Sequence, residues 1–161
     1  MRDDGITLVF LSQCRVALID NVDAPRILRH KWHLGTTGYA VRTVRTVESP
    51  RGTTVRMHRV IAGTPKGMDT DHINGRILDN RRCNLRHATH AENTRNSATP
   101  SSNRSGYRGV GWHPQRNKWR ARIKTGGVER HLGLFDSAKE AAMAYDEAVL
   151  ELFGEFARTN F

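Results

Sequence analysis

The residues best suited to chemistry in this chain lie between positions 71 and 93. Asp71 and His72 are adjacent, and Asn84 and Asn93 follow at short distances. Carboxylate and amide oxygens are ligands that Mg²⁺ or Mn²⁺ accepts, so Asp71 and Asn93 could hold such an ion. A histidine beside them can take a proton from water, because its pKa lies near neutral pH. Together these groups could hydrolyse a phosphodiester with the help of a metal ion.

Local signals predict how these residues are positioned. Thr89 and Glu92 have the spacing of a capping box, so a helix should begin there and carry Asn93 in its first turn. The Asn-Gly pair at 74–75 suits a turn that follows a strand ending at His72. We therefore expect a strand, a loop and a helix that form one compact ββα platform.

Three submotifs in this order resemble the HNH endonuclease family, in its phage and intron homing-endonuclease branch. They are D-H-I-N-G at 71–75, D-N-R-R-x-N-L-R at 79–86 and T-x-x-E-N at 89–93. The resemblance implies that His72 is the general base and that Asp71 and Asn93 are metal ligands. It also implies that Asn84 is the central asparagine that braces the loop. The first submotif alone could be an ordinary turn, but the three in sequence favour the family.

The charge of the chain favours a polyanionic partner. The 161 residues carry a formal net charge of +10, and the sequence pI is about 10.6. Such a positive field attracts a polyanion and speeds the encounter with it. Double-stranded DNA is the partner that we expect.

The cysteines and the apolar segments exclude other classes. Cys14 and Cys83 form no C-x-x-C pair, so we expect neither a structural zinc site nor a disulfide framework, and we expect both as packed thiols. No apolar run is long enough to span a membrane, and the acidic N-terminus does not suit a signal peptide. These features predict a soluble cytoplasmic protein without a membrane partner, and the family resemblance implies that it is phage-encoded and acts in the host cell.

The front part of the chain predicts mainly strands. Strands are expected within 6–19, a short helix within 21–33, a hairpin of 38–45 with 53–57, and a short helix from 58 to 62. At the start of that last helix, we expect His58 to be a packed, hydrogen-bonded residue without a catalytic role.

The C-terminal part predicts a small sheet and one helix. Strands are expected at 107–112, 119–125 and 128–135, with a tight turn at Gly126-Gly127. Ser137 and Glu140 fit a capping box for a helix that ends near Gly154.

One of these strands, residues 118–124, alternates between apolar and cationic side chains. Its apolar face comprises Trp119, Ala121 and Ile123, and its cationic face comprises Lys118, Arg120, Arg122 and Lys124. Neighbouring like charges repel, and a polyanion across the face would relieve that repulsion. We therefore expect this sheet to bind DNA, extended by Arg108, Arg116 and Arg130. A solvated basic surface is the alternative.

The same C-terminal segment resembles the Apetala/ethylene-response-factor DNA-binding domain of plants. The matches are Y-R-G-V at 107–110, K-W-x-A-x-I at 118–123, L-G-x-F at 132–135, A-A-x-A-Y-D-E-A at 141–148 and N-F at 160–161. The resemblance implies a three-stranded sheet that binds DNA. Gly111 and His131 replace residues usual in plant members, so the plant target sequence does not carry over.

The sequence thus predicts an α+β protein with two domains. A ββα-metal HNH nuclease domain occupies 1–96, a linker 97–106 and the DNA-binding domain 107–161. The predicted function is site-selective, Mg²⁺-dependent cleavage of duplex DNA by a homing-type endonuclease, acting as a monomer or a homodimer. The alternatives are a non-catalytic DNA-binding regulator with an inactive HNH fold, and an RNA-binding protein.

Overall fold

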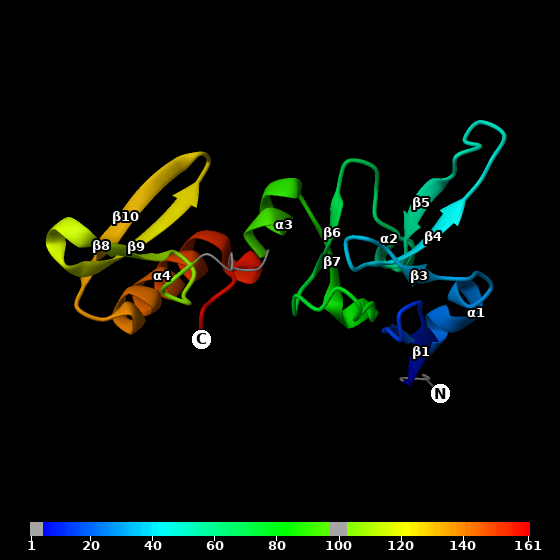
Figure 1. Ribbon diagram of the computed structural model, residues 1–161, viewed down its shortest axis with the longest axis horizontal. Coiled ribbons are helices and arrows are strands. Elements are labelled where there is room, and N and C mark those ends of the chain that lie inside the picture. Colours follow the sequence, from blue (N-terminus) through cyan, green and yellow to red (C-terminus); the bar gives the residue numbers. More distant parts are fainter. Residues whose placement is uncertain (1–4, 97–102) are drawn as a thin grey trace. The chain divides into compact units, whose positions relative to one another are not determined.

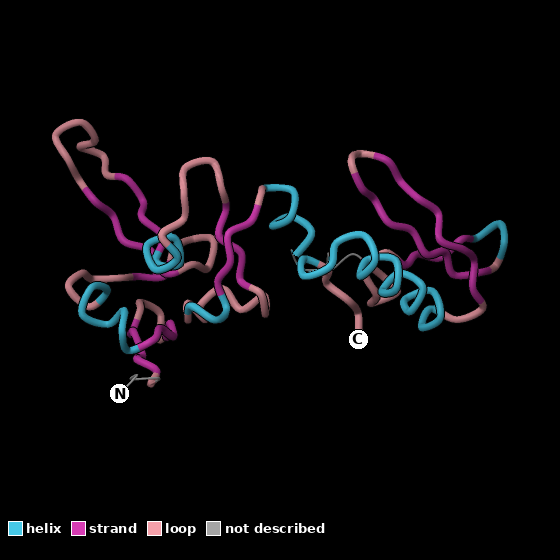
Figure 2. The backbone as a smooth tube through the Cα atoms, turned by 180° about the vertical axis from the view of Figure 1, so that it is seen from behind, coloured by secondary structure: helices cyan, strands magenta, loops and turns pink. Residues whose placement is uncertain are grey.

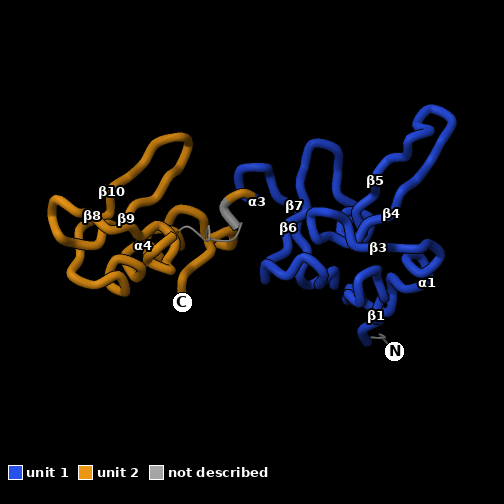
Figure 3. Tube along the Cα trace, viewed as in Figure 1, with its two compact units in different colours: residues 1–93 blue, residues 94–161 orange. Residues whose placement is uncertain are grey.

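The chain folds into two compact units, residues 1–93 and residues 94–161 (Figure 3). The computed structural model describes residues 5–96 and 103–161 (Figure 1). Most of the predicted linker, residues 97–102, lies outside the described residues.

The first unit begins with two small antiparallel sheets. One sheet pairs β1 (Ile6–Phe10) with β2 (Val16–Asp20), and the other has the order β3 (His33–Leu34), β4 (Ala40–Val44), β5 (Thr53–Arg56). Along the chain, the 3-10 turn η1 (Asn21–Asp23) and the short helix α1 (Ala24–Ile27) come between β2 and β3. The predicted hairpin of 38–45 with 53–57 is confirmed as β4 and β5.

The first unit ends with a second hairpin between two short helices. Its elements are α2 (Met57–Ala62), β6 (Asp69–His72), the 3-10 turn η2 (Arg82–Asn84), β7 (Leu85–Ala88) and α3 (His90–Asn96). Strands β6 and β7 pair antiparallel, and α3 follows directly, so the predicted order of strand, loop and helix is present. A core of apolar side chains joins α2 and the start of β7 to β1 and β2, with Ile19, Ile27 and Met57 fully buried.

His58 lies buried in the first turn of α2. Its ring packs against the ring of Tyr39, with the centroids 4.8 Å apart. The imidazole Nδ1 has no hydrogen-bond partner among the described residues, so this side chain is packed as expected but not fully hydrogen-bonded. Burial, followed by repulsion from the nearby His72, lowers the pKa of His58 to about 3.

The second unit is a three-stranded antiparallel sheet with one long helix beside it (Figure 2). Its elements are β8 (Val110–His113), the 3-10 turn η3 (Pro114–Arg116), β9 (Lys118–Thr125), β10 (Val128–Phe135), α4 (Ala138–Phe153) and the 3-10 turn η4 (Gly154–Phe156). The central strand is β9. The predicted β9, β10 and helix are confirmed, and so is the capping box of Ser137 with Glu140.

The first strand of this sheet starts later than predicted, at Val110 instead of Tyr107. Gly109 has a positive φ of 71°, a conformation that breaks an extended strand. A Cβ atom there would lie 2.0 Å from Tyr145 of α4, so only glycine fits. The alanines of α4 allow this close approach, because Ala141 and Ala142 are fully buried against the sheet.

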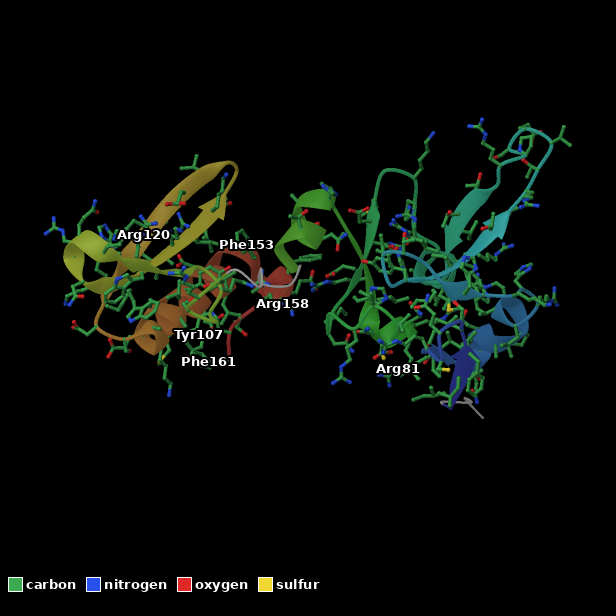
Figure 4. The ribbon with its side chains drawn as sticks, viewed as in Figure 1. Arg81, Tyr107, Arg120, Phe153, Arg158 and Phe161 are labelled. Atoms are coloured by element: carbon green, nitrogen blue, oxygen red, sulfur yellow. The ribbon has the colours of Figure 1, made fainter. Side chains whose placement is uncertain are left out.

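A buried carboxylate fastens the C-terminal tail to α4. Asp146 accepts hydrogen bonds from the backbone and the side chain of Asn160 at 2.8 Å, and from the backbone of Phe161 at 3.1 Å. Asn160 in turn accepts a bond from the backbone N–H of Arg108 at 2.6 Å. The ring of Phe161 then packs on Tyr107, with centroids 5.5 Å apart (Figure 4). This network closes the second unit.

The structure bears on two expectations, one about the cysteines and one about membrane-spanning segments. Cys14 and Cys83 are both exposed, so the prediction of packed thiols was wrong. Each lies in a polar turn, Cys14 between β1 and β2 and Cys83 in η2, where there is no core to bury it. No helix among the described residues is both long and apolar enough to cross a bilayer.

We predict that Asp146→Ala destabilises the second unit by about 2–4 kcal/mol, because several donors would lose a charged acceptor. Asp136→Ala is the matched control, since that carboxylate is exposed and, among the described residues, forms an ion pair only with Lys118. Urea unfolding followed by tryptophan fluorescence measures both variants. Equal unfolding midpoints for the two variants would contradict the stabilising role of the hydrogen bonds to Asp146.

We predict that acid weakens the first unit through His58. The unfolded chain binds a proton at this residue below about pH 6.5, whereas the folded chain does so only near pH 3. Stability therefore falls as the pH drops through this window, by up to about 1.4 kcal/mol per pH unit.

His58→Phe keeps a ring but removes the titration, so its unfolding free energy should change less between neutral and mildly acidic buffer. His30→Phe, an exposed position, is the control. If His58→Phe and the wild type lose the same stability on acidification, His58 is not the acid-sensitive group.

Candidate active site

The β6–β7 hairpin brings together the acidic, basic and imidazole groups of the site. Asp71 lies opposite Arg86 in the register, and His72 lies opposite Leu85. Asp69 and Asp71 share one face of β6, because successive side chains alternate. Asp71 and His72 are only 3% and 4% exposed, so each requires a partner in the interior.

Asp71 is neutralised by its cross-strand neighbour. The carboxylate Oδ2 accepts from Arg86 Nε at 2.8 Å and from Nη2 at 2.7 Å. A two-point guanidinium contact of this kind is short and directional. It compensates the cost of burying the charge and fixes the orientation of the carboxylate.

His72 is held by the side chain of Asn80. The distance from His72 Nε2 to Asn80 Oδ1 is 3.1 Å, and the Asn80 amide nitrogen points to Met57 and to the carbonyl of Leu78. An amide oxygen only accepts hydrogen bonds, so Nε2 carries the proton of the neutral ring. The lone pair that can accept a proton is then on Nδ1.

The surroundings of His72 keep its ring neutral. Burial lowers its pKa, opposed by the hydrogen bond to Asn80 and by the charges of Asp71 and Asp79. The ring of His58 packs edge-on at 5.0 Å between centroids, and the ring of Tyr39 lies at 6.0 Å. A neutral, oriented imidazole is the form that can act as a base.

Asn84 ties together the loop that joins β6 to β7. Its Oδ1 accepts from the backbone N–H of Asn74 at 2.9 Å, and its Nδ2 donates to the carbonyl of Asp79 at 2.7 Å. The Asp79 carboxylate accepts from the Asn74 amide and from Arg81, which is labelled in Figure 4. The hydrogen bonds from Arg81 hold the pKa of Asp79 below its usual range.

The start of α3 faces β6 through Asp69. Thr89 and Glu92 form the predicted capping box, with Thr89 N–H donating to the Glu92 carboxylate at 2.7 Å and Glu92 N–H donating to Thr89 Oγ1 at 3.3 Å. In the first turn, the Asn93 amide donates to Asp69 Oδ2 at 3.2 Å, and His90 Nδ1 lies 3.1 Å from the same oxygen. These two contacts, with His90 the larger, lower the pKa of Asp69.

The structure thus pairs Asn93 with Asp69 and pairs Asp71 with Arg86. The Oδ1 atom of Asn93 accepts no hydrogen bond from the described residues. Asp69 and Asn93 are in hydrogen-bonding contact, and Asp71 shares the face of Asp69 on β6, so these side chains are the oxygen donors here that a hard ion such as Mg²⁺ or Mn²⁺ could use. Nowhere in residues 5–96 and 103–161 do three His, Cys, Asp or Glu side chains gather around one metal position.

Sequence reasoning assigned no role to three residues that the structure places at the site: Asp69, Asn80 and Arg86. A signal existed for Asp69, because it stands two residues before Asp71 and so shares its face of the strand. Asn80 and Arg86 fell within the quoted submotifs, but which side chain each would contact depends on the loop geometry and the strand register. Neither can be inferred from spacing alone.

The second unit presents the predicted cationic strand. Ala121 and Ile123 are buried toward α4, so the cations at 118, 120, 122 and 124 lie on the opposite face of β9. Two of them form ion pairs at 2.9 Å, Lys118 with Asp136 and Arg122 with Glu129. The Nε atom of Arg120 is buried and has no hydrogen-bond partner among the described residues (Figure 4).

Of the three arginines expected to extend this surface, Arg130 lies on the other face of the sheet. Arg130 stands opposite Ile123 and so belongs to the face of Ile123, although it remains exposed. Arg108 is half-buried, and its side chain hydrogen-bonds to Tyr145 of α4. Arg116 is exposed in η3, beyond the end of β8. Sequence alternation did not place these residues, because Arg130 follows a hairpin turn that resets the register, and Arg108 and Arg116 lie outside the strands.

Comparison with known proteins supports both halves of this description. A family model described as AP2 domain matches residues 105–155. The chain is 32% identical over 142 residues to Uncharacterized HNH endonuclease L560 of Acanthamoeba polyphaga mimivirus, which covers 84% of this chain and 70% of that protein.

Two further relatives agree with these matches. Protein 3.8 of Escherichia phage T7 is 38% identical over 94 residues, or 58% of this chain and 77% of that protein. The Ethylene-responsive transcription factor ERF069 of Arabidopsis thaliana is 42% identical over 66 residues, or 38% of this chain and 41% of that protein. The chain belongs to the HNH endonuclease family and carries an AP2-type DNA-binding domain in its C-terminal part.

Proposed function

We propose that the protein is a divalent-metal-dependent DNA endonuclease of homing type. The observation that carries the proposal is the buried pair of Asp71 and His72, in which Asn80 holds the imidazole with Nδ1 as its basic atom. A buried acid beside a neutral, oriented histidine is costly for folding and useful for hydrolysis. The family relationship to proteins named HNH endonucleases supports the same reaction class.

The metal ligands in this proposal are Asp71 and Asn93, and Asp69 is a further oxygen donor on the same face of β6. The chemistry that Mg²⁺ or Mn²⁺ supplies there is charge neutralisation at the scissile phosphate and stabilisation of the leaving oxygen. Arg86 holds the Asp71 carboxylate in place.

His72 is the general base in this mechanism. Its Nδ1 accepts a proton from a water molecule as the water oxygen attacks phosphorus, and the bond from phosphorus to the leaving oxygen breaks. The imidazolium that forms is stabilised by the Asn80 amide oxygen and by the charge of Asp71. Asn84 holds the loop between β6 and β7 in one conformation, which keeps the base and the proposed ligands in fixed positions relative to each other.

The C-terminal sheet positions the DNA. The exposed cations of β9, Arg122 and Lys124, contact the phosphates or base edges of double-stranded DNA. With one such active site among the described residues, the protein acts as a monomer that nicks one strand or cuts both by sequential nicks, or as a homodimer that cuts both strands. The viral and phage relatives support action inside an infected host cell.

The direct test is cleavage of supercoiled plasmid in the presence of Mg²⁺. We expect nicked or linear product from the wild type, and a rate about a hundredfold to ten-thousandfold lower from His72→Ala, because the general base is lost. His30→Ala is the matched control, since that histidine is exposed in the first unit and far along the chain from the site. Chelation of the metal should abolish cleavage.

Equal rates for the wild type and His72→Ala would refute His72 as the base. The absence of product from the wild type, with tight binding to the same plasmid, would favour a non-catalytic DNA-binding regulator instead.

A further inference from the structure

The first unit has a groove on the face of the β3-β4-β5 sheet, with a volume of about 750 Å³. Val41 on the central strand forms its floor, between His33 of β3 and Arg56 of β5, which are its cross-strand neighbours. Arg59 of α2 and Thr54 of β5 contribute to its walls. The groove is thus a surface of one rigid sheet and the helix that follows it.

The lining of this groove is cationic and contains no carboxylate. It presents two guanidinium groups, an imidazole and threonine hydroxyls. Arg56 and Arg59 form no ion pair with any described residue, in contrast to Arg122 on the sheet of the second unit, which pairs with Glu129. The carboxylate of Asp69 lies within electrostatic reach of Arg59 but outside ion-pair distance. Guanidinium groups beside hydroxyl donors are the groups that bind phosphate oxygens in proteins.

Both arginines are held in position without losing their charge. Arg59 donates to the carbonyl of Met68 at 2.8 Å and to that of Pro65 at 3.4 Å, and both acceptors are neutral. The guanidinium of Arg56 lies over the ring of Tyr39, 5.3 Å from its centroid. Such side chains lose less conformational entropy when an anion binds than free arginines would.

The same tyrosine connects the groove to the candidate active site. Tyr39 packs against His58 at 4.8 Å and lies 6.0 Å from His72, so one ring separates Arg56 from the proposed base. A phosphodiester strand held by Arg56 would therefore lie near the proposed base.

We propose that this groove binds the phosphate backbone of the DNA substrate, with Arg56 and Arg59 as the phosphate contacts and Thr54 as a hydroxyl donor. The inference rests on the proposed nuclease function and adds a second DNA-holding surface, independent of the sheet in the AP2 domain. The first unit would then bind the DNA strand next to the phosphodiester that it cleaves.

The test is the salt dependence of DNA binding by the full chain. A fluorescently labelled duplex of mixed sequence is titrated with protein in chelating buffer, where no cleavage occurs, at several salt concentrations. Loss of one phosphate contact makes the negative slope of log K against log salt shallower by about 0.9. We expect this reduction for Arg56→Gln and recovery of most of the slope in Arg56→Lys, which keeps the charge.

The control is Arg15→Gln, which removes the same charge from an exposed turn between β1 and β2. An unchanged slope in Arg15→Gln, with a reduced slope in Arg56→Gln, supports the groove. Equal slopes in the two variants overturn it, because only the net charge would then matter. Thr54→Val gives a second check that alters no charge, and it should weaken binding without changing the slope.

The binding test separates this inference from the nuclease proposal. A reduced slope in Arg56→Gln together with no cleavage by the wild type would keep the groove and refute the enzyme. Cleavage by the wild type with an unchanged slope in Arg56→Gln would keep the nuclease proposal and refute the groove as a phosphate-binding surface. Preference of the wild type for single-stranded RNA over duplex, with the slope change seen only on RNA, would overturn DNA as the occupant.

Discussion

The burial of polar side chains on β6 is the constraint on which the rest of the first unit depends. Asp71 and His72 are nearly inaccessible, and a buried polar group without a partner costs folding free energy. Arg86 across the hairpin satisfies the acid, and Asn80 in the loop satisfies the imidazole. The loop must therefore return to β6 in one conformation, which Asn84 then fixes. The partners that make the strand foldable are the same groups that orient the proposed metal ligand Asp71 and the proposed base His72.

In the proposal, both units hold the anionic substrate. The first unit carries the buried site and a groove whose two arginines form no ion pair among the described residues, and the second carries a sheet whose cations are partly paired with carboxylates. In the second unit, Asp146 gathers the C-terminal tail against α4, which supports the sheet from its apolar side. A net charge of +10 alone would attract DNA without positioning it. Rigid helices and strands that hold individual arginines in place can position a DNA strand.

The sequence predicted most elements but not the contacts inside the site. Alternation found the faces of β9, and capping boxes found the starts of α3 and α4, because these are local properties of neighbouring residues. The partner of Asp71 depends on the register of β7, and the partner of His72 depends on the path of a loop. Gly109 delays β8 because of a contact with Tyr145, far away in the sequence. Arg130 was assigned to the cationic face, but the register of β10 places it on the other one.

The most direct test of the account is the protonation state of the His72 ring in the free protein. Long-range proton–nitrogen NMR at neutral pH distinguishes the two neutral tautomers from the imidazolium, and comparison with His72→Gln assigns the signals. The account predicts a neutral ring with its proton on Nε2, and loss of that preference in Asn80→Leu. A ring protonated on Nδ1, or an imidazolium, would contradict the proposal that Asn80 prepares His72 to accept a proton.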